Sequence, residues 1–265
     1  MTFITLLLCL ALERFLHRGN FLRRFNWFEQ YVAKINDLTK DKEWTQLHFI
    51  PLLLVILPIV VVIAAVYFLS AAFVHGLLTF LIGIGVLFYC LGPVNIFDSK
   101  EVHQTIFWQA NESLFAVVFW MSLFGPIAAL VYRLVERSAH IHASYPALGK
   151  AAHQIRALLD WLPVRLFSIL SALAGNFVQT SQFCLDYLLR DVSFNRELIE
   201  KSGRIALGLD DSAQLTTDNY TSALKLIDRN LILFFFFFFA VNLGVLLYLG
   251  QMKQFCIKIN HIVIV

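Results

Sequence analysis

Two segments carry the side chains that could do chemistry, and both set charged groups against long apolar runs. The first, Gln109 to Arg133, reads QANESLFAVVFWMSLFGPIAALVYR, with Asn111 and Glu112 near its start. The second, Asp160 to Gly175, reads DWLPVRLFSILSALAG. Ionisable groups in apolar surroundings are costly unless they have partners. Such groups at the mouths of buried segments could bind a polar ligand or a metal–nucleotide complex.

Each of these residues also has a plain structural explanation. Asn111, Glu112 and Arg133 can mark a water interface, and the helix dipole stabilises an acid near a helix start. Asp160 can cap the helix that follows it. Arg165 either snorkels to water from an interfacial helix or forms a fixed cation that faces an anionic ligand. Both interpretations of these five residues stay open at this point.

The composition is that of an integral membrane protein. Of 265 residues, 59% are hydrophobic and only 15% are charged, against about 25% in a soluble domain. The formal net charge of +3 is small and no basic stripe is present, which excludes nucleic acid as an expected partner. The four cysteines are far apart in sequence and are expected to be small buried hydrophobes. His140 and His142 would lie on different faces of a helix, so no metal site is expected.

Uncharged apolar runs predict the membrane spans, because a spanning helix needs about 20 such residues. They cover Phe49 to Ser70, Leu77 to Pro93 and Leu231 to Gly250. A shorter run over residues 1–12 predicts a retained membrane-inserting helix. We therefore predict an all-α, polytopic helical membrane protein, with the bilayer as its first partner.

The segment Ser113 to Tyr132 is apolar but contains Gly125-Pro126 past its middle. It is either a kinked span or two half-helices that enter the membrane and return. Lys and Arg number seven between residues 13 and 47 and eleven between residues 133 and 230. Positively charged flanks prefer the cytoplasm, and two cytoplasmic flanks need an even number of spans between them. That argument favours the re-entrant form without deciding it.

The remaining chain divides into two parts. Residues 133–230 carry eleven basic and ten acidic residues and predict several amphipathic helices, cytoplasmic or interfacial. Together with the apolar runs they make one membrane domain over residues 1–250. Residues 251–265 alternate apolar and polar side chains, a strand-like pattern that fits nothing before it and predicts an atypical tail.

The two chemistry-bearing segments resemble a known superfamily, the CobD/CbiB proteins of cobalamin biosynthesis. DWLPVRLFSILSALAG is similar to their N-Y-I-P-A-R-L…A-L-A-G segment, and the stretch from residue 110 to 134 to their E-N-T-S-D-G…A-Y-R segment. The match is closer to the AmpE branch, with A-N-E…F-A-V-x-F-W…G-P…L-x-Y-R-L and D-W-x-P-V-R-L. The apolar run that ends in Glu13-Arg14 and the L-x-D-R-x-L sequence at Leu226 to Leu231 also match. The resemblance extends to about residue 250.

The AmpE resemblance implies a bacterial inner-membrane protein linked to β-lactamase induction and cell-wall recycling, with a suggested nucleotide-binding role. The CobD/CbiB resemblance implies an ATP-dependent synthase that joins an aminoalcohol phosphate to a corrinoid carboxylate, with Mg²⁺ as a cofactor. It would place Arg165 on the Arg of P-A-R, Arg133 on that of Y-R, and Glu112 on the Asp of S-D-G. This chain has ANES where the synthases have ENTSDG.

Three functions are therefore compared. The first is an AmpE-like signalling protein with a ligand pocket formed by Asn111, Glu112, Arg133, Asp160 and Arg165. The second is a working amide-forming membrane synthase. The third, a transporter subunit or scaffold, predicts acids or amides inside the spans, where only Asn242 qualifies. None of these patterns identifies a protein partner.

Overall fold

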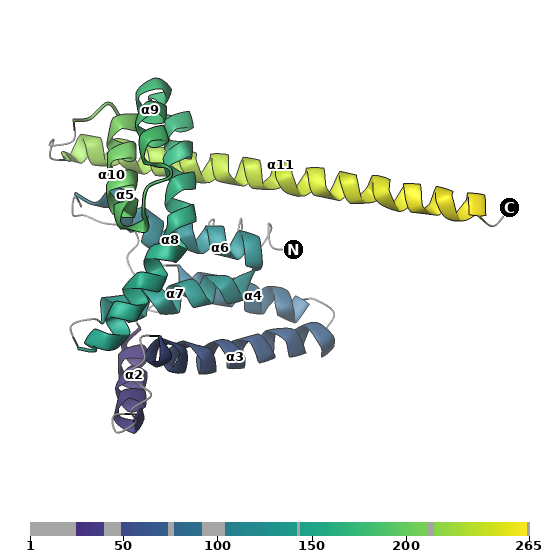
Figure 1. Ribbon diagram of the computed structural model, residues 1–265, viewed down its shortest axis with the longest axis horizontal. Coiled ribbons are helices and arrows are strands. Elements are labelled where there is room, and N and C mark those ends of the chain that lie inside the picture. The colour runs from purple at the N-terminus through teal and green to yellow at the C-terminus, as the bar shows by residue number, and fades with distance from the viewer. Residues whose placement is uncertain are drawn as a thin grey trace.

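The computed structural model describes residues 25–39, 49–73, 77–91, 104–141, 144–210 and 215–263, and within these ranges every regular element is helical (Figure 1). The prediction of an all-α chain is confirmed for them. The elements are α2 (Asn26–Thr39), α3 (Ile50–Phe73), α4 (Leu77–Cys90), α5 (Ile106–Ala110), the π-helix η4 (Asn111–Phe115), α6 (Ala116–Phe124), α7 (Pro126–His140), α8 (Pro146–Ala174), α9 (Phe177–Tyr187), the 3₁₀ turn η5 (Val192–Phe194), α10 (Asn195–Ala206) and α11 (Thr217–Val263).

Among the described residues, three helices are long and apolar enough to cross a membrane, judged by length and composition. They are Ile50–Ser70, Pro146–Ala174 and Thr217–Val245. The expected run 49–70 coincides with the first except for one residue, and the expected run 231–250 overlaps the third over residues 231–245. The run from residue 77 forms the 14-residue helix α4, which at 1.5 Å per residue is about 21 Å long and shorter than a full crossing.

The segment 113–132 takes the returning form. Helix α6 ends at Phe124, Gly125 adopts φ +81°, and Pro126 opens α7 at a first-turn position. Glycine meets the positive φ without a steric penalty, and proline suits a first turn because its missing N–H would have no partner there. Helices α6 and α7 then lie side by side (Figure 1). The pair is a helical hairpin whose tip is Leu123 to Pro126.

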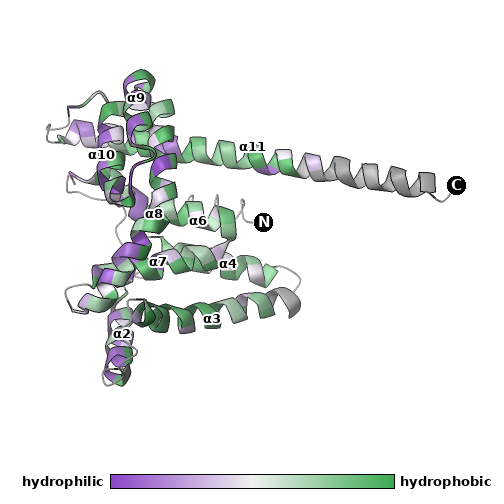
Figure 2. Ribbon diagram, in the orientation of Figure 1, coloured by the Kyte–Doolittle hydropathy of each residue, from purple (hydrophilic) through white to green (hydrophobic). Residues whose placement is uncertain are grey.

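The helices fall into an apolar set and a polar layer. In Figures 1 and 2, α3, α4, the α6–α7 hairpin and the apolar part of α11 all extend in the same direction from a layer that contains α9, α10 and the polar half of α8. The chain enters this set at Ile50 and is back at the layer by Cys90, and the α6–α7 hairpin returns in the same way. The described basic residues from Arg133 to Arg229 therefore lie at the layer.

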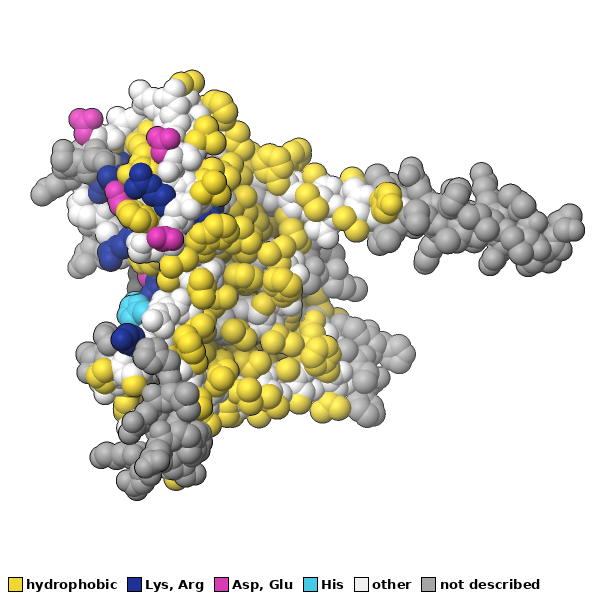
Figure 3. All heavy atoms as spheres, in the orientation of Figure 1, with side chains coloured by type: hydrophobic (Ala, Val, Ile, Leu, Met, Phe, Trp, Pro, Cys, Tyr) yellow, Lys and Arg dark blue, Asp and Glu magenta, His cyan; other side chains and the backbone are white. Residues whose placement is uncertain are grey.

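Helix α8 has the length of a span but a different orientation. It runs across the axes of α3 and α11 (Figure 1) and cannot cross the same slab as they do. Its outer face exposes Leu158, Leu162, Ile169 and Leu173, and apolar side chains form a continuous surface over this side of the molecule (Figure 3). A helix with one apolar and one polar face that lies along the layer fits the predicted interfacial type.

The core forms where α8 packs against α7, α9, α10 and α11. Phe167 of α8 stacks edge-on against Phe115, whose ring meets Phe234 of α11 at 5.4 Å between centroids. At Gly203 the α10 backbone lies against the ring of Phe107, where an added Cβ would come within 2.6 Å of ring carbons. This close approach requires glycine.

The tail differs from its prediction. Helix α11 continues through Val263, so residues 251–263 are helical and do not form the strand that their alternation suggests. A helix that is already under way extends at little cost, and this outweighs a weak period-2 pattern. The predicted segment 1–12 and Glu13-Arg14 lie outside the described residues.

Candidate functional site

The centre of the site is a buried carboxylate, Asp160, which is 0% exposed. Its Oδ1 accepts hydrogen bonds from Nδ2 of Asn111 at 3.0 Å and from the hydroxyl of Tyr132 at 2.8 Å. Its Oδ2 accepts from Nε of Arg156 at 3.3 Å. Three donors from three different helical elements thus meet one carboxylate, as a buried charge requires.

Arg156 joins this carboxylate to a second one. Its Nη2 forms an ion pair with Oε1 of Glu112, and its guanidinium lies 5.2 Å from the ring centroid of Trp108. Arg156 is 6% exposed, so its charge is balanced inside the protein and not by water. Glu112, Arg156 and Asp160 therefore form one ionic chain that ties η4 to α8.

The π-helix η4 explains how Asn111 and Glu112 reach α8. A π-turn holds one residue more than an α-turn, which widens the helix locally and releases carbonyl groups from the regular ladder. Nη2 of Arg133 donates to two of these carbonyls, Glu112 O at 3.1 Å and Ser113 O at 3.2 Å. The guanidinium thus stabilises an irregular backbone that otherwise lacks partners.

Arg133 is itself held in place on its other edges. Nε donates to the Cys90 carbonyl at 2.5 Å and Nη1 to Oε2 of Glu136 at 2.9 Å. Glu136 also binds Arg137 and Nε2 of His140. Burial raises the pKa of Glu136, but the charges of Arg133, His140 and Arg137 outweigh burial and lower that pKa to about 2. Arg133 therefore fastens α4, α7 and η4 together.

A cavity of about 740 Å³ opens beside the ionic chain. Its lining comes from α5, η4, α7, α8, η5 and α10 and includes Thr105, Trp108, Gln109, Glu112, Ala139, His140, His153, Arg156, Ala157, Asp160, Val192, Ser193, Asn195 and Arg196. A volume of this order suits a drug-sized or nucleotide-sized ligand. The cavity lies in the polar layer, where charged side chains gather on the molecular surface (Figure 3).

The cavity wall has fixed charges of both signs. Glu112 and Asp160 are both bonded to Arg156, whereas Arg196 is exposed and makes no hydrogen bond or ion pair with any other described residue. Arg196 therefore supplies positive charge that no described carboxylate neutralises by contact. The imidazoles of His140 and His153 also line the cavity.

Arg165 lies elsewhere. Its guanidinium donates to the carbonyls of Leu188 and Arg190 at 2.5 Å each, and to Oδ1 of Asn195 at 2.9 Å. It also stacks over the Trp161 ring at 4.2 Å. Neither alternative drawn from the sequence describes this arrangement, because the side chain is 4% exposed and binds a loop end of its own chain.

Of the five residues singled out in the sequence, Glu112 and Asp160 line the cavity, and the buried Asn111 joins them through its hydrogen bond to Asp160. Arg133 donates to the η4 backbone and does not line the cavity. Arg165 does not line it either, although it binds Asn195, which does. Sequence reasoning missed Arg156, the cation that links the two carboxylates. Its signal was the spacing of four residues to Asp160 on one helix face.

A further, partly buried carboxylate, Glu200, lies outside the cavity lining and holds the helical run beside it. Oε1 of Glu200 in α10 accepts the backbone N–H of Trp108 at 2.8 Å, which satisfies one of the donors at the start of the α5–η4–α6 helical run. Burial raises the pKa of Glu200 to about 7, although this hydrogen bond and the charges of Arg204 and Arg196 act in the opposite direction.

The donor set does not fit the Mg²⁺–nucleotide complex that the synthase resemblance implies. Glu112 and Asp160 share one guanidinium, and among the described residues no group of three or more His, Cys, Asp or Glu side chains stands close enough to hold a metal ion. A hard cation would have to displace Arg156 from both carboxylates.

Comparison of the chain with protein-family models, with curated proteins and with solved structures gives no significant match.

Proposed function

We propose that this chain is an AmpE-like regulatory protein of the bacterial inner membrane that binds a small anionic ligand in the cavity of its polar layer. The single observation that supports the ligand most strongly is the cavity wall at Arg196, where an exposed guanidinium faces about 740 Å³ of open volume. The regulatory role rests on the family resemblance.

Membrane insertion is supported by the segregation of the helices. The faces of α3 and α11 turned away from the core expose Leu53, Val61, Phe68, Phe236 and Val241, among others, each at least half exposed. Apolar surface of this extent is stable in lipid and unstable in water. After carbonate washing, we expect the protein to remain in the membrane pellet. Recovery in the supernatant would contradict insertion.

The chemistry of the cavity favours an anion over a cation. An incoming cation would compete with Arg156 for Glu112 and Asp160, and that competition leaves a buried guanidinium without its partners. An incoming carboxylate or phosphate meets Arg196 directly and can reach His140 and His153. Trp108 offers an apolar face beside them.

The test measures binding to the detergent-solubilised full chain. We expect nucleotides or anhydro-muropeptides to bind, and Arg196→Gln to weaken binding about 10–100-fold, the effect of removing one charge-assisted hydrogen bond. Lys225→Gln removes an equally exposed cation from α11, outside the cavity, and is the matched control. Equal affinities for all three proteins would refute the cavity as the ligand site.

The regulatory role needs a separate readout. In a strain that lacks the gene, we expect the wild-type chain to restore normal β-lactamase induction and Arg196→Gln to fail at equal abundance in the membrane. If both proteins restore induction equally, the cavity has no part in regulation. ATP consumption by the purified protein with an amine and a carboxylic acid would instead identify the amide-forming synthase.

A further inference from the structure

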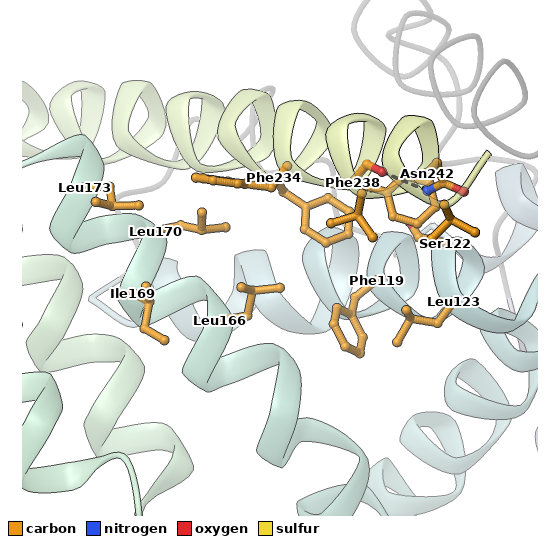
Figure 4. A pocket seen from close by; sticks show the side chains of 13 residues that line it. Phe119, Ser122, Leu123, Leu166, Ile169, Leu170, Leu173, Phe234, Phe238 and Asn242 are labelled. Carbon is orange, nitrogen blue, oxygen red and sulfur yellow. Dashed lines mark hydrogen bonds between the residues drawn. The ribbon is translucent and has the colours of Figure 1, made fainter. Parts of the chain in front are cut away.

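A second hollow lies on the apolar side of the molecule, between α6, α8 and α11. It has a volume of about 640 Å³ and is lined by thirteen side chains, eleven of them hydrocarbon or aromatic. Figure 4 shows Leu166 to Leu173 of α8 closing one end, while Phe119 and Leu123 of α6 face α11 across the opening. We call this hollow the α6–α11 groove.

The groove offers few polar groups to a ligand. Its two polar side chains are Ser122 and Asn242, and both donate to their own helices: Oγ of Ser122 to the Val118 carbonyl at 2.6 Å, and Nδ2 of Asn242 to the Phe238 carbonyl at 2.7 Å (Figure 4). An occupant of this groove gains mainly by the burial of apolar surface, which favours a hydrocarbon chain.

The depth of the groove matches one leaflet of a bilayer. Its wall on α11 runs from Phe234 to Val245, and the rise along the helix between these two residues is about 16 Å. The hydrocarbon core of a bilayer is about 30 Å thick, so one leaflet is about 15 Å deep. The opposite wall ends where α6 ends, at Phe124. A partner helix that spans the membrane would contact both α6 and α11 along only half of its length, whereas an acyl chain of one leaflet would contact both along its whole length.

A cation stands at the polar end of the groove. Nη1 of Arg229 donates to the carbonyl of Ala174 at 3.4 Å, and Ala174 follows Leu173, which lines the groove. Arg229 is exposed, and this long hydrogen bond is its one contact of that kind with the described residues. It is also the last charge before the uncharged run 231–250. The guanidinium therefore lies at the level of lipid phosphates, with most of its five donors available.

We propose that the α6–α11 groove binds one acyl chain of an anionic phospholipid, with the lipid headgroup at Arg229. The proposal rests on the membrane insertion put forward above and is independent of the ligand in the polar cavity. Charge complementarity at one end and leaflet-deep apolar walls select the same class of molecule.

The experiment uses the full chain in nanodiscs that contain phosphatidylglycerol and phosphatidylcholine with identical acyl chains. Native mass spectrometry counts the lipids retained after release. We expect phosphatidylglycerol to be retained about fivefold more than phosphatidylcholine, the ratio that one basic residue at the membrane surface produces. Arg229→Gln should bring the ratio close to one, while Lys150→Gln, which removes an exposed cation at the far end of α8, should leave it unchanged.

Filling the groove tests the acyl chain itself. Ile169→Trp, and independently Val241→Trp, should reduce retention of both lipids, because each places an indole in the groove from a different wall. Val61→Trp adds the same bulk to the exposed face of α3 and is the control. Equal retention of the two lipids by the wild type, or unchanged retention in both tryptophan variants, would overturn the proposal. So would photo-crosslinking from position 237 to residues 1–24 or to a second copy in place of lipid.

Discussion

Removal of the Asp160 carboxylate gives the sharpest test of the buried network. Asp160→Ala leaves the Asn111 amide and the Tyr132 hydroxyl without their acceptor, each at a cost of about 1–3 kcal/mol in a dry site. It also removes one of the two carboxylates that balance Arg156. Breaking a buried ion pair on one side typically costs about 3–5 kcal/mol. We expect a loss of that size.

The order of three variants adds detail to this prediction. Asp160→Asn keeps the shape but turns either an N–H group or a weaker acceptor toward Arg156, so it should cost less than alanine and still be substantial. Tyr132→Phe removes one donor and leaves Asp160 with two others, so about 1–2 kcal/mol is expected. Asp186→Ala changes an exposed carboxylate on α9 and should have almost no effect.

Thermal unfolding of the purified protein in detergent measures these differences. For a chain of this size, 1 kcal/mol corresponds to about 2–4 °C in the midpoint, so Asp160→Ala should lower it by about 6–20 °C. A midpoint within 2 °C of the wild type would refute the network, since two donors without an acceptor and the loss of one of the two carboxylates bound to Arg156 cannot cost so little. A loss as large in Asp186→Ala would show that the assay reports something other than buried pairing.

Three further predictions concern other parts of the molecule. The pKa of Glu200 lies at about 7 in the folded chain against an ordinary 4.5, so the folded state holds the proton to higher pH. Stability should therefore fall as pH rises from about 4.5 to 7 and then level off, by at most about 3 kcal/mol at about 1.4 kcal/mol per pKa unit. Glu200→Gln should abolish this dependence in thermal midpoints taken at pH 5 and 8. Gly203→Ala pushes a methyl group into the Phe107 ring and should cost about 1–3 kcal/mol, measured in the same assay, with Gly85→Ala, whose Cβ meets nothing within 4 Å, as control. Arg165→Lys loses the planar guanidinium that binds several backbone carbonyls, so the thermal midpoint should fall while the ligand affinity of the folded fraction stays unchanged. Weaker ligand binding at an unchanged thermal midpoint would contradict the position of Arg165 outside the cavity lining.

The sequence predicts the apolar helices well because the physical requirement is local. An uncharged run such as 49–70 needs no tertiary partner to be recognised, since lipid imposes its own length and composition. Gly125-Pro126 likewise marks a break that any helix must respect. Whether the chain continues or returns at that break depends on packing between α6 and α7, and no residue pattern states this.

The site is less accessible to sequence reasoning for the same physical cause. Arg156 and Asp160 are four residues apart on one helix and could have been paired, but Glu112 is more than forty residues away and joins them only through the fold. Arg165 resembles a ligand-facing cation by its surroundings in sequence. Its partners are backbone carbonyls of the segment 188–190, which every residue type provides, so nothing in the side chains there signals the contact.

Helix α8 shows how an amphipathic pattern can imitate a span. Its second half, from residue 166 to 174, is free of charge, and its mean hydropathy over 18 residues passes the threshold for a membrane helix. Its polar residues Ser168 and Ser171 are 0% exposed and face α10 and α11, where they bind Ser202 and Asn230. Hydropathy averages both faces, so it does not separate a helix that crosses a membrane from one that lies along it.

The π-helix at Asn111 to Phe115 inserts one extra residue into an otherwise α-helical run. Deleting a single residue there would let the run from Ile106 to Phe124 relax into an uninterrupted α-helix, and everything on one side of the deletion would rotate by about 100° relative to the other. Glu112 would swing out of reach of α8, and Arg133 would face carbonyls that already have partners. Insertion or deletion of this one residue would therefore change the chemistry of the polar layer while every other residue keeps its identity.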